Sequence, residues 1–404
     1  MELIREMTTS PKTKPAVDKL GFGVHFSDHM FVSDFNPKEG WHADRIVPYR
    51  NFSLDPAAAA LHYGQTLFEG MKAFRGVDNK IRLFRPEMNF NRLHAGAARL
   101  CLQGPPLKNF MNGIIELVKT ERDWIPSQEG TALYIRPTLI GTEPFLGVRP
   151  ANEILFYIIT SPVGGYYGAK IDPVSIWIET KYARAAVGGI GNVKAGGNYA
   201  ASLLAAQEAK KKGFSQVLWL DGAERRFVEE VGTMNVFFVK GDTVITPALN
   251  GRILPGVMRD SAIQVLESLG VTVEQRPVEV YEILKGLKEG TVTEAFGTGT
   301  AAAVAPIASF GTETAKLQVG NGQVGPITSQ LMTYFADLYY GRIEDNFGWT
   351  LDIDQPYQLN ENASVARQPY LPAEELDDVE ASIEAILAEV GLGDMTSAHG
   401  SSRN

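Results

Sequence analysis

Cysteine is almost absent from this 404-residue chain, which contains only Cys101. One thiol can form neither an internal disulfide nor a zinc cluster. Its neighbours in "ARLCLQG" are apolar, so we expect Cys101 to pack in the core. Such sparing use of cysteine is typical of proteins in the reducing cytoplasm, and we expect a cytoplasmic location.

Long apolar runs are missing as well. The N-terminal stretch "MELIREMTTSPKTK" lacks the apolar core of a signal peptide, and no run of about 18 uncharged apolar residues occurs anywhere. We therefore expect neither export nor a membrane span.

Positive charge is scarce and scattered. The chain has 38 Lys and Arg against 47 Asp and Glu, a formal net charge of -9, and no basic stripe. Such a chain repels a polyanion, so nucleic acid is a poor candidate partner. The 6 histidines have no carboxylate or thiol neighbours at the spacing of metal ligands, and we expect no metal site.

Apolar residues make up 44% of the chain, enough for real cores in two or three domains. Short β-like runs alternate with helical ones, which predicts a mixed α+β fold: a small N-terminal domain (1–168), a connector (169–174) and a larger domain (175–404). Within it, "EILFYIIT" is typical of a buried strand. An acidic helix over 373–391 and a frayed tail are expected at the C-terminus.

The stretch "GNVKAGGNYAAS" places Lys194 among glycines just before a helical pattern. Asn198 is the expected N-cap of a helix that ends at Lys211 to Gly213. The stretch matches neither of the glycine-rich nucleotide-binding patterns. On this pattern alone a solvated surface lysine is favoured over a reactive amine.

The run "RFVEEVGTMNVFF" has the alternation of a strand, which places Glu230 on a face with Val228 and Met234. A carboxylate desolvated in this way must raise its pKa or find a positive partner. A protonated pyridine nitrogen is one such partner. The alternative is an edge strand whose Glu230 reaches water.

Three stretches could bind phosphate. In "RILPGVMRDS", Pro255 and Gly256 precede a helix, which leaves the amides of Val257 and Met258 free for an anion. The turn "AFGTGTAAAV" could add backbone amides and the Thr300 hydroxyl. Arg92, in "FRPEMNFNRL", could form a bidentate contact. An ordinary helix start, an ordinary tight turn and a lone arginine are the alternatives.

Seven motifs occur together, in one order, between about residues 20 and 350: "LHYGQTLFEGMKAFRG", "IRLFRPEMNFNRL", "YIRPTLIGTEPFLGV", "VKAGGNYAAS", "EEVGTMNVFFV", "ILPGVMRDS" and "GTGTAAAVAPI". The set closely resembles the branched-chain amino acid aminotransferases of the pyridoxal-phosphate fold type IV superfamily, in particular their longer, eukaryotic-type branch. The resemblance implies the two-domain mixed α/β fold of that superfamily.

The same resemblance implies a cofactor site. Lys194 would hold pyridoxal phosphate as a Schiff base and then shuttle the α-proton, which requires a neutral amine near pH 7. Glu230 would keep the ring nitrogen protonated, and Tyr199 would hydrogen-bond the ring oxygen. The remaining positions that match cofactor ligands of the family are Arg92, Thr233, Val257, Met258 and Thr300.

The resemblance also implies an apolar, aromatic substrate pocket and a homodimer. The positions that match its lining are Phe22, Phe68, Tyr134, Tyr166 and Ala301, while Tyr63 and the 300–301 turn are candidates for carboxylate binding. Leu146 and Val148 match a loop that reaches into the other subunit's pocket. Where animal members carry a redox-active CxxC, this chain has Ala302 and Ala305, so thiol regulation is not expected.

The activity implied is amino transfer from L-leucine, L-isoleucine or L-valine to 2-oxoglutarate. Two alternatives stay open at this point. A D-amino acid aminotransferase or aminodeoxychorismate lyase would share Lys194 and Glu230 but not the aliphatic pocket. A non-catalytic binding protein would have lost the lysine or the phosphate site, and both are present here.

Overall fold

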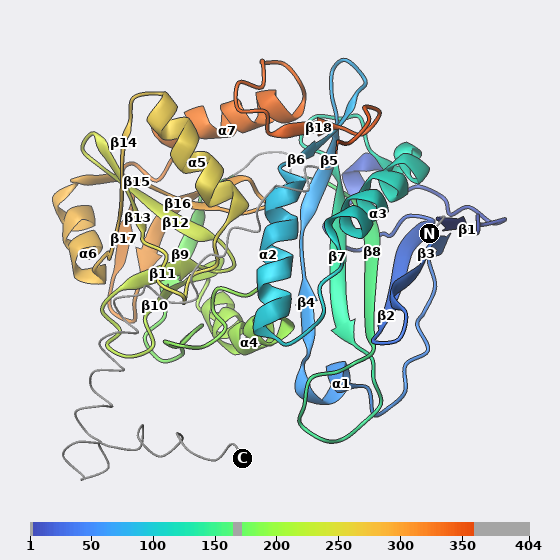
Figure 1. Cartoon of the computed structure of the whole chain (residues 1–404). Helices are drawn as coiled ribbons and strands as arrows, with labels where there is room; N and C mark the ends of the chain where they lie inside the picture. The colour runs from blue at the N-terminus through green and yellow to red at the C-terminus, as the bar shows by residue number, and fades with distance from the viewer. Residues whose placement is uncertain (1–2, 165–171, 359–404) are drawn as a thin grey trace, which may run out of the picture. The chain divides into compact units, whose positions relative to one another are not determined.

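The computed structural model describes residues 3–164 and 172–358, which form one compact unit built around two sheets (Figure 1). The helices are α1 (Ala59–Tyr63), α2 (Pro86–Arg99), α3 (Leu107–Thr120), α4 (Gly196–Lys211), α5 (Val257–Ser268), α6 (Val280–Glu289) and α7 (Pro326–Tyr339). Short 3-10 helices span Val17–Lys19 and Arg122–Trp124.

The first sheet is almost entirely antiparallel, with the order β1-β3-β2-β8-β7-β5-β6-β18 and β4 beside β7. Its strands are β1 (Ile4–Arg5), β2 (His29–Asn36), β3 (Gly40–Pro48), β4 (Thr66–Phe68), β5 (Met71–Arg75), β6 (Ile81–Phe84), β7 (Ala132–Gly141), β8 (Ile154–Val163) and β18 (Thr350–Asp352). The predicted buried strand is β8, and it pairs with β7 along its whole length. Both strands are buried on nearly every residue, which explains the continuous apolar run of β8.

The second sheet mixes parallel and antiparallel pairs in the order β11-β10-β9-β16-β15-β12-β13-β14, with β17 beside β16. Its strands are β9 (Val174–Ile178), β10 (Gln216–Leu220), β11 (Val228–Val231), β12 (Asn235–Lys240), β13 (Thr243–Pro247), β14 (Thr272–Arg276), β15 (Val292–Thr298), β16 (Val304–Gly311) and β17 (Lys316–Gln318). A bridge between Val231 and Met234 joins β11 to β12, so this part of the sheet closes on itself.

The chain leaves the first sheet at Val163, enters the second at Val174, and returns to the first with β18. Helix α4 contacts both sheets, through β4 and β10. The domain limits expected from the sequence stay a prediction. The expected C-terminal helix and tail, and most of the expected connector, lie outside the described residues.

Close packing of α3 on β2 organises the first core. The buried face of α3 follows helical spacing, with Phe110, Ile114 and Leu117 fully enclosed. Gly113 lies against the Phe31 ring, and a Cβ at this position would lie 2.8 Å from that ring. The absence of a side chain lets the helix approach the sheet.

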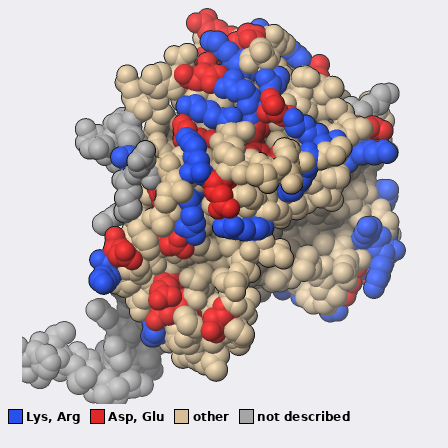
Figure 2. Space-filling view, turned by 90° about the vertical axis from the view of Figure 1, so that its right-hand side faces the viewer, with Lys and Arg blue, Asp and Glu red and all other residues tan. Residues whose placement is uncertain are grey.

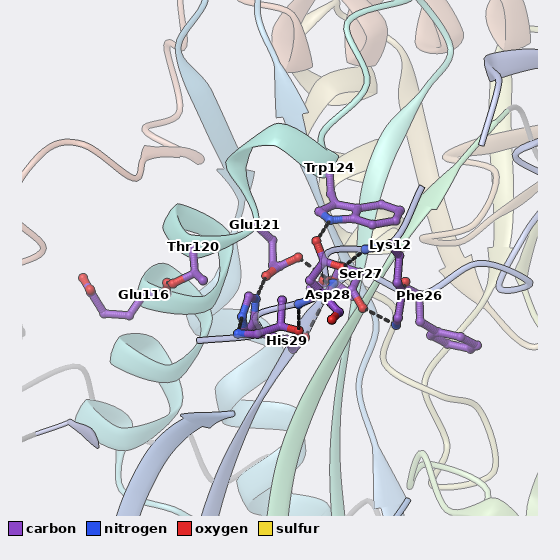
Figure 3. A network of polar contacts seen from close by, with 12 residues as sticks. Lys12, Phe26, Ser27, Asp28, His29, Glu116, Thr120, Glu121 and Trp124 are labelled. Atoms are coloured by element: carbon purple, nitrogen blue, oxygen red, sulfur yellow. Dashed lines mark hydrogen bonds and ion pairs between the residues drawn. The ribbon is translucent and has the colours of Figure 1, made fainter. Parts of the chain in front are cut away.

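A polar network holds the N-terminal segment against this core (Figure 3). Asp28 accepts hydrogen bonds from the Lys12 amide and the Trp124 indole, each at 2.8 Å. His29 Nε2 accepts from the Thr8 amide at 2.9 Å, so its Nδ1 carries the proton that it donates to Glu121 at 2.5 Å. The network fixes both ends of the segment that carries Phe22.

Three local expectations were wrong. The run over 226–238 is not one strand but the hairpin of β11 and β12, which turns at Gly232 (φ 57°) and Thr233. Cys101 is exposed, because it follows the end of α2 in a left-handed conformation (φ 54°). Asn198 is not an N-cap, since α4 begins at Gly196 after Ala195.

Acidic and basic side chains are interspersed on the face drawn in Figure 2, with no field of a single sign. No helix within residues 3–164 and 172–358 is both long and apolar enough to cross a bilayer. Over the same ranges, no group of three or more His, Cys, Asp or Glu could hold a metal ion.

Candidate active site

Eleven of the residues singled out in the sequence line one cavity of about 390 Å³. They come from the N-terminal segment, β4, α2 and β7 on one side and from α4 and its approach, the β11–β12 turn, α5 and the β15–β16 turn on the other. These residues are Phe22, Phe68, Arg92, Tyr134, Lys194, Tyr199, Thr233, Val257, Met258, Thr300 and Ala301.

The glycine-rich approach to α4 is held in place by neighbouring backbone. The Phe68 amide donates to the Lys194 carbonyl at 3.1 Å, and Leu67 forms a bridge with Ala195. Asn198 uses its side-chain amide to hold the loop before the lysine, donating to the carbonyls of Ile190 and Val193 at 2.7 and 2.8 Å. The lysine is therefore fixed at its backbone and does not extend over solvent.

The Lys194 amine points into the cavity and donates to the Tyr199 hydroxyl at 2.8 Å. Burial, assisted by the charge of Arg92, lowers the pKa of Lys194 to about 8. Burial and the charge of Glu230 raise the pKa of Tyr199 to about 12, so the phenol stays protonated. A lysine in this setting has a substantial neutral fraction close to physiological pH, as a nucleophile requires.

Glu230 is 2% exposed and lies just behind the cavity, in β11. Its Oε1 accepts from the Leu254 amide at 2.7 Å, and its Oε2 pairs with Arg184 Nε at 3.1 Å. Burial raises the pKa of Glu230, and the Arg184 guanidinium offsets part of that rise. The structure agrees with the first of the two alternatives for Glu230. Its carboxylate is buried next to a cation and does not reach water.

Sequence reasoning did not single out Arg184, although its charge offsets part of the rise in the pKa of Glu230. Its other two nitrogens donate to the carbonyls of Arg252 and Gly191, at 2.8 and 3.0 Å. These bonds fix the guanidinium beside the carboxylate. The arginine lies ten residues before the lysine, in a stretch without periodicity, so no sequence pattern marks it.

Arg92 lies on α2 and forms a bidentate pair with Glu69, with both N···O distances 2.8 Å. Its remaining nitrogen donates to the Pro255 carbonyl at 3.0 Å, just before α5. Glu69 is fully buried and also accepts from Asn89 at 2.8 Å; despite burial, Arg92 holds the pKa of Glu69 below its usual range. Sequence reasoning missed Glu69, which orients the arginine.

Helix α5 begins at Val257, as predicted, and no side chain caps it. The amides of its first turn therefore have no acceptor within the helix. The preceding residue, Gly256, packs on Asn235, and a Cβ there would lie 2.0 Å from the Asn235 oxygen. Together with Thr300 and Arg92, these amides form a cradle of donors suited to a phosphate.

Aromatic rings form the apolar wall of the cavity. Phe22 contacts Tyr134 edge to face at 5.0 Å, and Phe68 contacts Tyr199 at 4.8 Å. Arg136, also missed in the sequence, lies over the Phe68 ring at 4.6 Å. Its Nε is buried without a hydrogen-bond partner, so this wall carries one cation able to receive an anion.

Three predicted residues are grouped away from this cavity. Tyr63 donates to the Leu146 carbonyl at 2.5 Å, and Leu146 and Val148 are 68% and 88% exposed. None of the three is among the residues that line the cavity of their own chain. Tyr166 lies outside the described residues.

The family model described as "Amino-transferase class IV" matches residues 66–310. The chain belongs to this family. Two relatives of this class IV aminotransferase are the branched-chain-amino-acid aminotransferase 2 of Bacillus subtilis, 46% identical over 86% of this chain and 96% of that one, and the branched-chain-amino-acid aminotransferase of Mycolicibacterium smegmatis, 43% identical over 85% and 97%.

Solved structures confirm the expected fold of this class IV aminotransferase. A branched-chain amino acid aminotransferase of Escherichia coli is similar with a TM-score of 0.69 and 26% identity, over 81% of this chain and 99% of that one. The T.th. enzyme of the same name, solved with pyridoxamine 5'-phosphate, has a TM-score of 0.67 and 26% identity, over 80% and 98%. The placement in a longer, eukaryotic-type branch stays a prediction.

Proposed function

We propose that this protein transfers the amino group of L-leucine, L-isoleucine or L-valine to 2-oxoglutarate, reversibly, with pyridoxal phosphate as cofactor. The observation that carries the proposal is a lysine of lowered pKa in an aromatic cavity that also holds a phosphate cradle and adjoins a buried carboxylate. The relatives of 43–46% identity that carry branched-chain names support the same activity.

The cofactor supplies an electron sink for the charge that develops at the α-carbon of the substrate. Arg92, the first-turn amides of α5 and Thr300 would bind its phosphate, and Lys194 would hold its aldehyde end. Glu230, which pairs with Arg184 at 3.1 Å, would be the anionic partner of a protonated ring nitrogen. Tyr199 receives a hydrogen bond from the lysine amine at 2.8 Å and so aims it into the cavity.

Lys194 also moves the proton. Because its pKa is about 8, the amine can both accept a proton from the α-carbon and return one without a large energetic cost. The walls formed by Phe22, Phe68 and Tyr134 exclude water from this exchange.

Substrate selection follows from the same walls. Aliphatic side chains have no polar handle, so aromatic surface binds them, and one methylene is worth about 1–3 kcal/mol of discrimination. The Arg136 guanidinium is placed to receive a substrate carboxylate, with its Nε free of partners. A related T.th. enzyme, 25% identical, has been solved with 4-methylvaleric acid, an apolar carboxylate.

A homodimer completes the pocket in this proposal. Leu146 and Val148 are 68% and 88% exposed in the single chain, and Tyr63 ties their loop to α1. The loop would insert beside the cavity of the partner, where Tyr63 could reach a carboxylate. The cytoplasm is the proposed location.

The test is amino-group transfer from a panel of L- and D-amino acids to 2-oxoglutarate. We expect activity with the three branched L-amino acids and none with D-alanine; a preference for D-amino acids would assign the protein to another branch. Lys194→Ala should abolish turnover. Borohydride reduction of the wild type should attach the cofactor to the peptide that contains Lys194, as detected by mass spectrometry.

Glu230→Gln provides the companion test, since the amide keeps the shape of the side chain but not its charge. We expect the variant to bind cofactor and to turn over at least about tenfold more slowly, because each pKa unit of lost stabilisation is about 1.4 kcal/mol, which is a factor of about ten in rate. An unchanged rate would show that the ring nitrogen is handled in another way.

A further inference from the structure

A second cavity, of about 950 Å³, lies next to the first and is larger. The two share one wall, formed by Gly70, the start of α5 and the turn over 300–302. The other described walls of the second cavity are mostly apolar and come from β5, β6 and α7, with Phe74, Phe84, Met332, Ala336 and Tyr339. Nothing in the proposed transamination uses this space.

Lys72 is the one cationic side chain among the described residues that line the second cavity. It belongs to β5, and its amine donates to the Ala301 carbonyl at 2.7 Å. An ammonium has three donors, and this backbone oxygen is its one hydrogen-bond partner in the described structure. Burial lowers the pKa of Lys72 to about 8, because desolvation disfavours the charged ammonium. A bound anion would offset this desolvation cost.

Acidic residues occur only at the rim of the described lining. Asp18 and Glu129 are both exposed, and Glu129 is paired with Arg342 at 2.9 Å. The interior therefore combines a large apolar surface with a single positive charge. This combination matches a molecule with an apolar body and one anionic end.

We propose that the second cavity is a binding site for an amphipathic monocarboxylate, whose carboxylate pairs with Lys72 and whose apolar body lies along Phe74, Phe84 and the face of α7. The carboxylate would share the ammonium with the Ala301 carbonyl. Since Ala301 also lines the reaction cavity, binding of a carboxylate in the second cavity would affect the turn over 300–302 that both cavities share. The site does not depend on the proposed reaction, because its test measures binding and not turnover.

The experiment titrates the full chain, with cofactor bound, with octanoate and separately with 1-octanol, by calorimetry. The two probes share an apolar body and differ in charge. In Lys72→Met, which keeps an apolar side chain of similar length, we expect octanoate affinity to fall at least about tenfold while octanol affinity changes less than about twofold. Lys72→Arg should retain octanoate binding, which also controls for folding.

Arg136→Met is the matched control, because Arg136 is the corresponding cation of the reaction cavity and does not line the second one. Octanoate that enters the reaction cavity would depend on Arg136, so this variant should leave unchanged the octanoate binding that Lys72→Met removes. The proposal is overturned if Lys72→Met binds octanoate as the wild type does, if both probes weaken equally, if Arg136→Met causes the loss instead, or if the wild type binds neither probe.

Discussion

At the scale of single residues, the pair of Glu69 and Arg92 connects stability to cofactor binding. Both side chains are buried, at 0% and 9% exposure, and two hydrogen bonds of 2.8 Å join them. In Glu69→Gln the buried guanidinium loses its counterion, which should reduce the free energy of unfolding of the cofactor-free protein by about 3–5 kcal/mol. Urea unfolding measures this change.

A bound phosphate would replace part of the negative charge that Arg92 loses in Glu69→Gln. The reduction in the free energy of unfolding should therefore be smaller with cofactor present. The control is Glu116→Gln, whose partners Arg5 and Lys119 lie at the surface. An exposed pair of this kind contributes less than about 1 kcal/mol. Equal effects of the two substitutions would contradict a special role for Glu69.

The lowered pKa of Lys194 predicts how its reactivity depends on pH. Burial, the main cause, disfavours the ammonium, so the neutral amine should predominate above a pH of about 8 rather than above 10.5. Acylation of the cofactor-free protein, followed on the peptide that contains Lys194, should reach half its maximal rate near this pH. The folded chain also binds fewer protons than the unfolded one between these values, so this group adds stability as pH rises across them. A midpoint near 10.5 would contradict the environment described here.

At the scale of elements, the approach of α3 to β2 depends on Gly113. Replacing glycine by alanine in a helix interior normally stabilises by up to about 1 kcal/mol. Here the added methyl would meet the Phe31 ring at 2.8 Å and Ile158 at 3.1 Å, so Gly113→Ala should instead destabilise by about 1–3 kcal/mol. Chemical unfolding would measure this. Asn112→Ala, on the exposed face of the same helix, is the control and should be neutral or slightly stabilising.

Elements with a continuous or strictly helical apolar pattern were predictable from the sequence, and those defined by a turn were not. Strand β8 contains the predicted run "EILFYIIT" except for its first residue, because burial on both faces selects apolar residues at nearly every position. The hairpin of β11 and β12 was missed, since the alternation continues through Gly232 and conceals its left-handed φ of 57°. Likewise Cys101 turns outward, although apolar residues surround it in the sequence.

At the scale of the whole molecule, the candidate site also contains residues that the sequence identifies and residues that only the fold identifies. Lys194, Arg92 and Glu230 were assigned to the site by the resemblance of seven ordered motifs to a known family, because the residue patterns alone left a surface lysine, a lone arginine and an edge-strand glutamate as alternatives. Their partners Glu69 and Arg184 come from other parts of the chain, 23 residues before Arg92 and 46 before Glu230, and only the fold brings them together. A buried charge in a sequence therefore predicts that a partner exists, and the tertiary structure is needed to identify it.

Association of two chains is the remaining property at this scale, and the exposed loop with Val148 allows a test. A charge placed on a residue that becomes buried between subunits is costly, so Val148→Asp should convert the expected dimer to monomers and lower turnover. Light scattering after size-exclusion chromatography would measure the mass. Val77→Asp, at another exposed valine (69% against 88%), should change neither mass nor turnover. A wild-type protein that is monomeric and fully active would show that the loop serves no partner, and then Tyr63, Leu146 and Val148 would have no part in the pocket.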